Sequence, residues 1–205
     1  MTPFYFTNLD IRIHLRRNSF YYITFILSII ISIIIGVIIV ISNESYLNLL
    51  VSSNKNLYSF INGKFSAMQI FKSVFFKFLY PILFVLILGM NFYLCIFSYL
   101  IVIYQFTIFF MTTFAVIQLY GISGVLTSFF IIVPVNLFFF CILIFVSVTS
   151  LERSKLAKNN RYFKEGYNSL YFIKIFFSII LLLAVSFVVA FIVPLILKSS
   201  IFSIF

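Results

Sequence analysis

The sequence predicts an all-α protein: a polytopic membrane bundle of about five transmembrane helices, with one amphipathic helix at the membrane interface. The chain of 205 residues is 64% hydrophobic and 9% charged, whereas a soluble domain is about 25% charged. Residues 78–151 contain no Lys, Arg, Asp, Glu or His. As one helix this block would be roughly 110 Å long, so it must cross a hydrocarbon core of roughly 30 Å about three times. Backbone polar groups in lipid need internal partners, which favours helices.

The chain begins with a polar tail at residues 1–19, and the first predicted span follows at residues 20–42. This apolar run is longer than the core of a signal peptide, and no small-residue cleavage pattern follows it. We therefore expect it to stay attached as an anchor. Three Arg residues precede it, and they predict a cytoplasmic N-terminus.

Residues 43–73 form the longest polar connection and are predicted to be an extracytoplasmic loop. Apolar residues recur every three or four positions from residue 57 to residue 78, with three lysines off that stripe. This period predicts an amphipathic helix along the outer membrane interface. An extension of the second span past the head groups is the alternative.

Residues 74–150 are predicted to hold three transmembrane helices. The clearer break between them is Gly121-Ile122-Ser123-Gly124, because glycine permits the backbone of a tight reversal. A basic cytoplasmic segment at residues 151–169 follows, and the last span covers residues 170–197. Residues 198–205 then form an extracytoplasmic C-terminus.

The distribution of basic residues supports this orientation in a bacterial cell membrane. Five spans from a cytoplasmic N-terminus put nine of the fourteen Lys and Arg residues inside and five outside, as the positive-inside rule requires. The inner group is Arg12, Arg16, Arg17, Arg153, Lys155, Lys158, Arg161, Lys164 and Lys174, and the outer group is Lys55, Lys64, Lys72, Lys77 and Lys198. The net charge of +10 therefore indicates membrane lipids as partners. Nucleic acid is not expected, because the chain has no basic groove or reader module.

The sequence predicts no catalytic site, cofactor or metal centre. Ionisable residues at membrane depth usually mark catalysis or transport, and the interiors of the predicted spans have none. The four acidic residues all lie in or near loops, and the chain has no HExxH, CxxC or glycine-rich phosphate loop. We therefore expect a protein that is not an enzyme.

Small and polar residues inside the spans are candidates for structural roles. Ser28, Ser32 and Gly36 are spaced by four residues, so they share one helix face and permit a close helix contact. We expect this face to pack within the protein, with a homo-oligomer or a partner helix as the alternative. Pro134 kinks the fourth span, and Asn136 needs a hydrogen-bond partner across the bundle. A transport site at this broken helix is the alternative.

Two neighbouring runs carry a family resemblance: Gly121-Ile122-Ser123-Gly124-Val125-Leu126-Thr127-Ser128-Phe129 and Val133-Pro134-Val135-Asn136-Leu137. They resemble the central signature of the stage II sporulation protein M family. The family is also similar in layout, with one anchor span before an outer loop, a charge-free block with a Gly-x-x-Gly turn, and a basic cytoplasmic segment before a final span. The third span departs from the family, whose members tend to have more glycines there.

The resemblance implies a non-enzymatic scaffold in endospore formation. Proteins of this family are integral membrane proteins of the engulfment machinery. They anchor and position two peptidoglycan hydrolases, an amidase and a lytic transglycosylase, for septal wall thinning. The chain is then expected in the mother-cell or septal membrane. The alternatives are the membrane subunit of an exporter with a partner ATPase, and a toxin-binding immunity protein.

Overall fold

The computed structural model describes residues 14–42, 67–91, 93–158 and 165–198. Every regular element in these ranges is helical, which confirms the predicted all-α class. Residues 14–17 form one helical turn. The larger elements are α2 (Ser19–Ser42), α4 (Ala67–Gly89), the 3₁₀ turn η1 (Cys95–Phe97), α5 (Ser98–Thr127), the π-helical turn η2 (Ser128–Ile132), α6 (Val133–Lys158) and α7 (Glu165–Lys198).

Five of these helices are long and apolar enough to cross a membrane, which confirms the predicted polytopic membrane bundle. Each apolar span has 20 to 24 residues. At about 1.5 Å per residue this length covers roughly 30 to 36 Å, enough for the hydrocarbon core of a bilayer. The spans are Ser19–Ser42, Ala67–Gly89, Cys95–Gln118, Asn136–Lys155 and Tyr171–Phe191.

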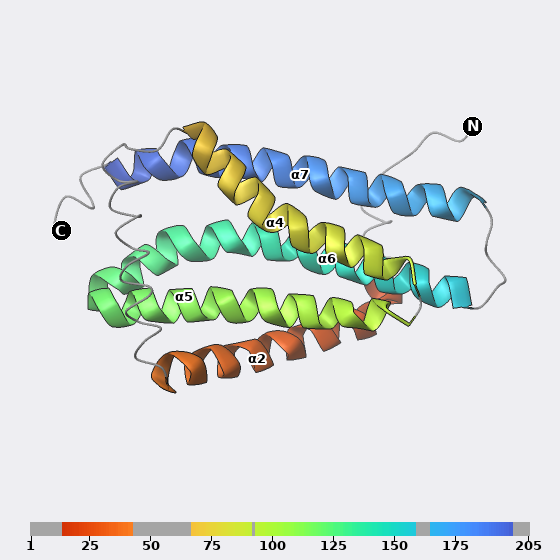
Figure 1. Ribbon diagram of the computed structural model, residues 1–205, viewed down its shortest axis with the longest axis horizontal. Coiled ribbons are helices and arrows are strands. Elements are labelled where there is room, and N and C mark those ends of the chain that lie inside the picture. Colours follow the sequence, from red (N-terminus) through yellow and green to blue (C-terminus); the bar gives the residue numbers. More distant parts are fainter. Residues whose placement is uncertain (1–13, 43–66, 92, 159–164, 199–205) are drawn as a thin grey trace.

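Helix α6 is the centre of the bundle. In Figure 1 it runs between α7 on one side and α5 on the other, with α2 beyond α5 and α4 crossing it obliquely. Accordingly, 67% of the α6 span is buried, against 18–28% in the other four spans. The outer helices direct most of their large apolar side chains away from the bundle. Such a surface suits lipid, because lipid tails are as apolar as these side chains.

Stacked aromatic rings join α6 to its neighbours. Phe78 of α4 stacks on Phe139 with 3.8 Å between ring centroids, and Phe106 of α5 stacks on Phe140 at the same distance. Phe139 and Phe140 are adjacent in α6, so α6 presents one ring to α4 and the next to α5. In lipid, close van der Waals contacts of this kind take the place of hydrophobic driving force between helices.

Helix α4 lies earlier in the sequence than the predicted second span. It begins at Ala67 and ends at Gly89, where Asn91 favours a turn by accepting the Tyr93 backbone N–H on its side-chain oxygen at 2.9 Å. The end of the predicted interfacial helix is therefore the first half of α4. Its beginning and the rest of the predicted outer loop, residues 43–66, lie outside the described residues. As a result, Lys77 lies midway along α4 rather than at its edge.

The chain reverses in the last part of α5, at a kink at Gly121 (Figure 1). Gly121 has φ 57° and ψ −128°, a conformation that residues with a Cβ rarely adopt. Gly124, after the kink, lies back against the part of α5 that precedes the kink, because a Cβ on Gly124 would be 2.3 Å from the carbonyl oxygen of Val116. The turn η2 follows, close to Pro134, which lacks the N–H of a regular helix.

We expect Gly124→Val to lower the free energy of unfolding by on the order of 2 kcal/mol, because the added side chain overlaps the Val116 carbonyl group. Val125→Ala is the control, because it changes an exposed side chain next to Gly124 and leaves the close approach intact. Thermal unfolding of the purified chain in detergent measures both variants. Equal midpoints would contradict the close approach at Gly124.

Candidate functional site

Four polar side chains meet at the end of the bundle where α2 begins. His14, Arg17 and Asn18 come from the turn before α2, and Glu152 comes from the C-terminal part of α6; we call these four residues the Glu152 cluster. Glu152 is 5% exposed and His14 is 8% exposed, whereas the Arg17 side chain is 57% exposed. A carboxylate buried to this extent requires neutralisation.

Two groups from the N-terminal segment contact the Glu152 carboxylate. The Nη2 of Arg17 donates a hydrogen bond to Oε1, and the Nδ1 of His14 lies 3.4 Å from Oε2. Asn18 fixes His14 in turn, because its Nδ2 donates to the His14 carbonyl oxygen at 3.1 Å and lies 3.2 Å from Nδ1. A charge-assisted hydrogen bond thus joins the start of the described chain to the central helix.

His14 is a neutral imidazole at physiological pH. The pKa of His14 is lowered from 6.5 to about 4, chiefly by burial and in addition by the positive charges of Lys174 and Arg17. The Glu152 carboxylate beside the imidazole is paired with Arg17. The ring of Phe145, 5.6 Å away between centroids, adds to the apolar surroundings.

Beside the cluster, Gly89 lets the end of α4 approach α6 and α7 closely. A Cβ on Gly89 would be 2.6 Å from the Cβ of Ser150 and 2.9 Å from the hydroxyl oxygen of Tyr171. Ser154 donates to the Gly89 carbonyl oxygen at 3.0 Å, and the guanidinium of Arg153 lies 4.4 Å from the centroid of the Tyr171 ring. Side chains of α6 and α7 therefore fasten the last turn of α4, where carbonyl groups lack partners within the helix.

Chemically, the arrangement neutralises one buried charge and joins α2, α4, α6 and α7 at one end of the bundle. The grooves between α4 and α5 and between α2 and α5 are lined by residues outside the Glu152 cluster. Within the ranges that the structure describes, no three His, Cys, Asp or Glu side chains come together as metal ligands would. The cluster is therefore a fastening between helices, with its carboxylate enclosed by its own partners.

The candidates Ser28, Ser32 and Gly36 lie on the face of α2 that packs against α5. Ser32 donates to the Ile103 carbonyl oxygen at 3.1 Å, and a Cβ on Gly36 would be 3.1 Å from the Cβ of Phe110. Ser28 is buried and bonds to a carbonyl of its own helix. The chain's own α5 thus covers this stripe, so an oligomer or a partner would use a different face.

Gly121, Gly124, Pro134 and Asn136 lie at the opposite end of the bundle, where α5 joins α6. Asn136 donates to the Ile132 carbonyl oxygen at 2.7 Å, within its own helical segment instead of across the bundle, as short polar side chains often do. Asn136 is sixteen residues before Glu152, roughly 24 Å along α6. The structure therefore brings none of these candidates into the Glu152 cluster.

The sequence predicts that Glu152 lies in a basic loop, whereas in the structure α6 extends to Lys158 and includes Glu152. The missed signal is the spacing of Ser147, Ser150 and Ser154, which are three and four residues apart and all buried. Residues at this spacing lie on one face of a helix, so the three serines indicate that the helix extends beyond Glu152. The carboxylate resembles a loop residue in the sequence because its partner, Arg17, is 135 positions away.

The fold and the site define a class: a polytopic α-helical membrane protein whose central helix is held by a buried ion pair. No protein-family model matches the chain, and no curated protein or solved structure matches it. The relation to the stage II sporulation protein M family therefore stays a prediction from residues 121–137.

We expect Arg17→Ala to lower the free energy of unfolding by on the order of 2 kcal/mol, because the Glu152 carboxylate stays buried without its guanidinium. A fully buried pair would cost about 3–5 kcal/mol, but Arg17 is 57% exposed. Glu152→Gln removes the buried charge itself and should cost less, about 1 kcal/mol.

The exposed neighbour Arg16 provides the control for the Arg17 prediction, since Arg16→Ala removes the same charge. Unfolding in mild detergent, followed by circular dichroism, measures all three variants. A larger loss for Glu152→Gln than for Arg17→Ala would contradict the assigned role of the ion pair.

The lowered pKa of His14 predicts that the stability of the folded chain depends on pH. Its pKa is lower in the folded chain than in the unfolded chain, so between pH 6.5 and about 4 the unfolded chain binds the proton more readily. Stability should therefore fall as the pH is lowered through this window, and His14→Gln should flatten that part of the profile. Thermal midpoints at pH 7 and pH 5 measure the effect; the same slope in both proteins would exclude His14 as its source.

Proposed function

We propose that this chain is a non-enzymatic integral membrane scaffold. The observation that carries the proposal is the use of Glu152, a buried carboxylate, in an ion pair that fastens helices. A carrier or an intramembrane enzyme needs its ionisable groups beside a cavity that substrate can enter. A bundle fastened at one end and apolar on its sides is suited instead to holding partners in place.

The proposed partners are peptidoglycan hydrolases, an amidase and a lytic transglycosylase, positioned for septal wall thinning and engulfment during endospore formation. The support is the layout similar to the stage II sporulation protein M family: α2 as an anchor, a connection before α4, the Gly121–Gly124 reversal and a final span in α7. Hydrolases that act on the wall work outside the membrane, so the scaffold supplies only their location.

The proposed orientation has a cytoplasmic N-terminus and an extracytoplasmic C-terminus in a bacterial cell membrane. In Figure 1, the start of α2 and the end of α7 lie at opposite ends of the bundle, in keeping with five spans. Arg16, Arg17, Arg153 and Lys155 belong to the end that carries the Glu152 cluster, and the positive-inside rule favours the cytoplasm for that end. In a sporulating host this would be the mother-cell or septal membrane.

The membrane subunit of an exporter is the second candidate, and Lys77 is the observation that favours it. Ionisable residues and broken helices within a membrane often belong to transport sites. Lys77 lies midway along α4, and the chain from α5 to α6 is interrupted at Gly121 and by η2. A partner ATPase would then dock on the basic segment at residues 152–168.

Deletion of the gene in a sporulating host tests the scaffold function. The expected phenotype is an arrest at engulfment with thick septal peptidoglycan, because the hydrolases lose their position. The full chain with an affinity tag should also co-purify an amidase and a lytic transglycosylase from sporulating cells. An unrelated tagged polytopic protein from the same membrane controls for non-specific capture. Normal engulfment in the deletion strain contradicts the scaffold, and capture of an ATPase in place of hydrolases favours the exporter.

A further inference from the structure

A groove of about 370 Å³ lies between α4 and α5 and opens on the outside of the bundle. We call it the α4–α5 groove. It exists because α4 crosses the bundle obliquely and packs mainly on α6 and α7 (Figure 1). One face of α4 and one face of α5 form its walls. The lining residues used below are Lys77, Tyr80 and Phe84 of α4, and Leu100 and Gln105 of α5.

The two most polar residues of the groove lie at one level, in the middle of the spans. Helix α4 has ten residues before Lys77 and twelve after it. The α5 span, Cys95–Gln118, has ten residues before Gln105 and thirteen after it. The neighbouring rings of Phe78 and Phe106 stack on adjacent residues of α6, which confirms the common level. Ten residues of helix are about 15 Å, half of a hydrocarbon core of roughly 30 Å.

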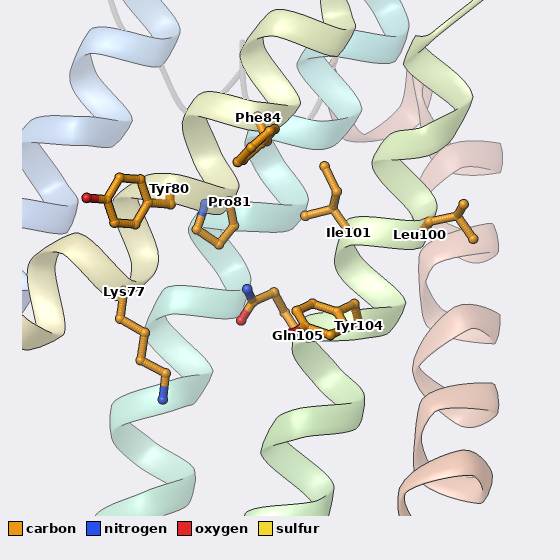
Figure 2. Close-up of a pocket in the computed structure, with 8 residues that line it drawn as sticks. All are labelled: Lys77, Tyr80, Pro81, Phe84, Leu100, Ile101, Tyr104 and Gln105. Carbon is orange, nitrogen blue, oxygen red and sulfur yellow. The ribbon is translucent and has the colours of Figure 1, made fainter.

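The α4–α5 groove is an apolar surface with one cation and one amide. Figure 2 shows Lys77 and Gln105 on the same side of the groove, with the Gln105 amide directed into the space between the two helices. Tyr80, Phe84 and Leu100 line the rest and are 57 to 61% exposed. The described helices of the chain therefore leave this surface uncovered.

Among the described residues, no carboxylate lies at the level of Lys77. Glu152 and Glu165 both belong to the end of the bundle where α4 finishes, and the other two acidic residues of the chain lie outside the described residues. The nearest aromatic contact of the ammonium is the Phe78 ring, with 5.5 Å between Nζ and the ring centroid. Charged residues inside spans are costly and pair with one another. Lys77 is therefore complementary to an anion that the described bundle does not supply.

The level of Lys77 decides which kind of anion fits. Lipid phosphates lie about 15 Å away along the helix, which is farther than the four-carbon stem of a lysine reaches. A second copy of the chain would bring another Lys77 and, among its described residues, no carboxylate at this level. A carboxylate in the middle of another protein's transmembrane helix has the right depth. Such a helix, about 10 Å across, would lie along the mouth of the groove and insert one row of its side chains.

We propose that the α4–α5 groove binds one transmembrane helix of a partner protein that carries an Asp or Glu near the middle of its span. The carboxylate of the partner pairs with the Lys77 ammonium, and the Gln105 amide donates a second hydrogen bond to it. Side chains three and four residues from the carboxylate pack against Phe84 and Leu100. The inference rests on the proposed scaffold function and gives the chemistry of a partner's membrane anchor.

Synthetic transmembrane peptides test this site on the full chain in phosphatidylcholine vesicles. One peptide is a leucine- and alanine-rich helix of about 20 residues with a single central Glu, and the matched peptide has Gln there. Energy transfer from a fluorophore on a C-terminal tag of the chain to one on the peptide measures association. The wild-type chain should bind the Glu peptide roughly tenfold more tightly, the size expected for one polar contact between helices in lipid.

Variants of α4 locate the contact. Lys77→Gln should remove the preference for the Glu peptide. Lys72→Gln is the matched control and should keep the preference, because it removes the same charge from an exposed position of α4 outside the groove. Lys77→Glu should lose the Glu peptide and bind a peptide with a central Lys instead, since the two charges are then exchanged. Circular dichroism verifies that each variant is folded, and Lys77→Gln decides the matter if Lys77→Glu does not fold.

Equal binding of the Glu and Gln peptides by the wild-type chain, an undiminished preference in Lys77→Gln, or an equal loss in Lys72→Gln would each overturn the proposal. Self-association of the chain that depends on Lys77 and needs no peptide would assign the groove to a second copy and would overturn it too. The peptide assay involves no wall hydrolase and no sporulating cell. Its failure is therefore distinguishable from a failure of the scaffold function, which the deletion strain tests.

Discussion

The pairing of Glu152 with Arg17 is the interaction on which the arrangement of the bundle depends. A carboxylate in the central helix of a membrane protein is tolerated only when a nearby cation neutralises it. Because Arg17 lies just before α2, the pair holds the start of the first span against the end of α6. The contacts of Gly89 with Ser150 and Tyr171 bring the end of α4 and the start of α7 to the same place. One end of the bundle is therefore fastened by polar contacts between four helices.

At the opposite end, the described residues are held by backbone geometry. Gly121 supplies a positive φ, and Gly124 lets the chain return within contact of Val116. Between the two ends, aromatic stacking and the small residues of α2 provide the close packing that lipid requires. This division of roles leaves the apolar outer sides of the outer helices uncovered within the bundle.

Much of the fold could be predicted from the sequence, because lipid imposes strong rules on composition. A charge-free block can be stable only as helices that cross the membrane, so the number of spans follows from hydropathy and length. The candidate site could not be predicted in the same way. Glu152 and Arg17 are 135 positions apart, and no local sequence pattern around either residue identifies the other as its partner. The position of Lys77 midway along a span could not be predicted either, because it depends on where α4 begins and ends.

The sequence by itself determined the class of protein: an all-α membrane bundle of five spans. Hydrophobicity and helix rise are local quantities, and they need no knowledge of neighbours. Only the tertiary structure decided which helix is central, which partner neutralises Glu152 and which groove Lys77 faces. These features arise from contacts between distant residues, and the cost of burying a charge can be judged only when the opposite charge is in place.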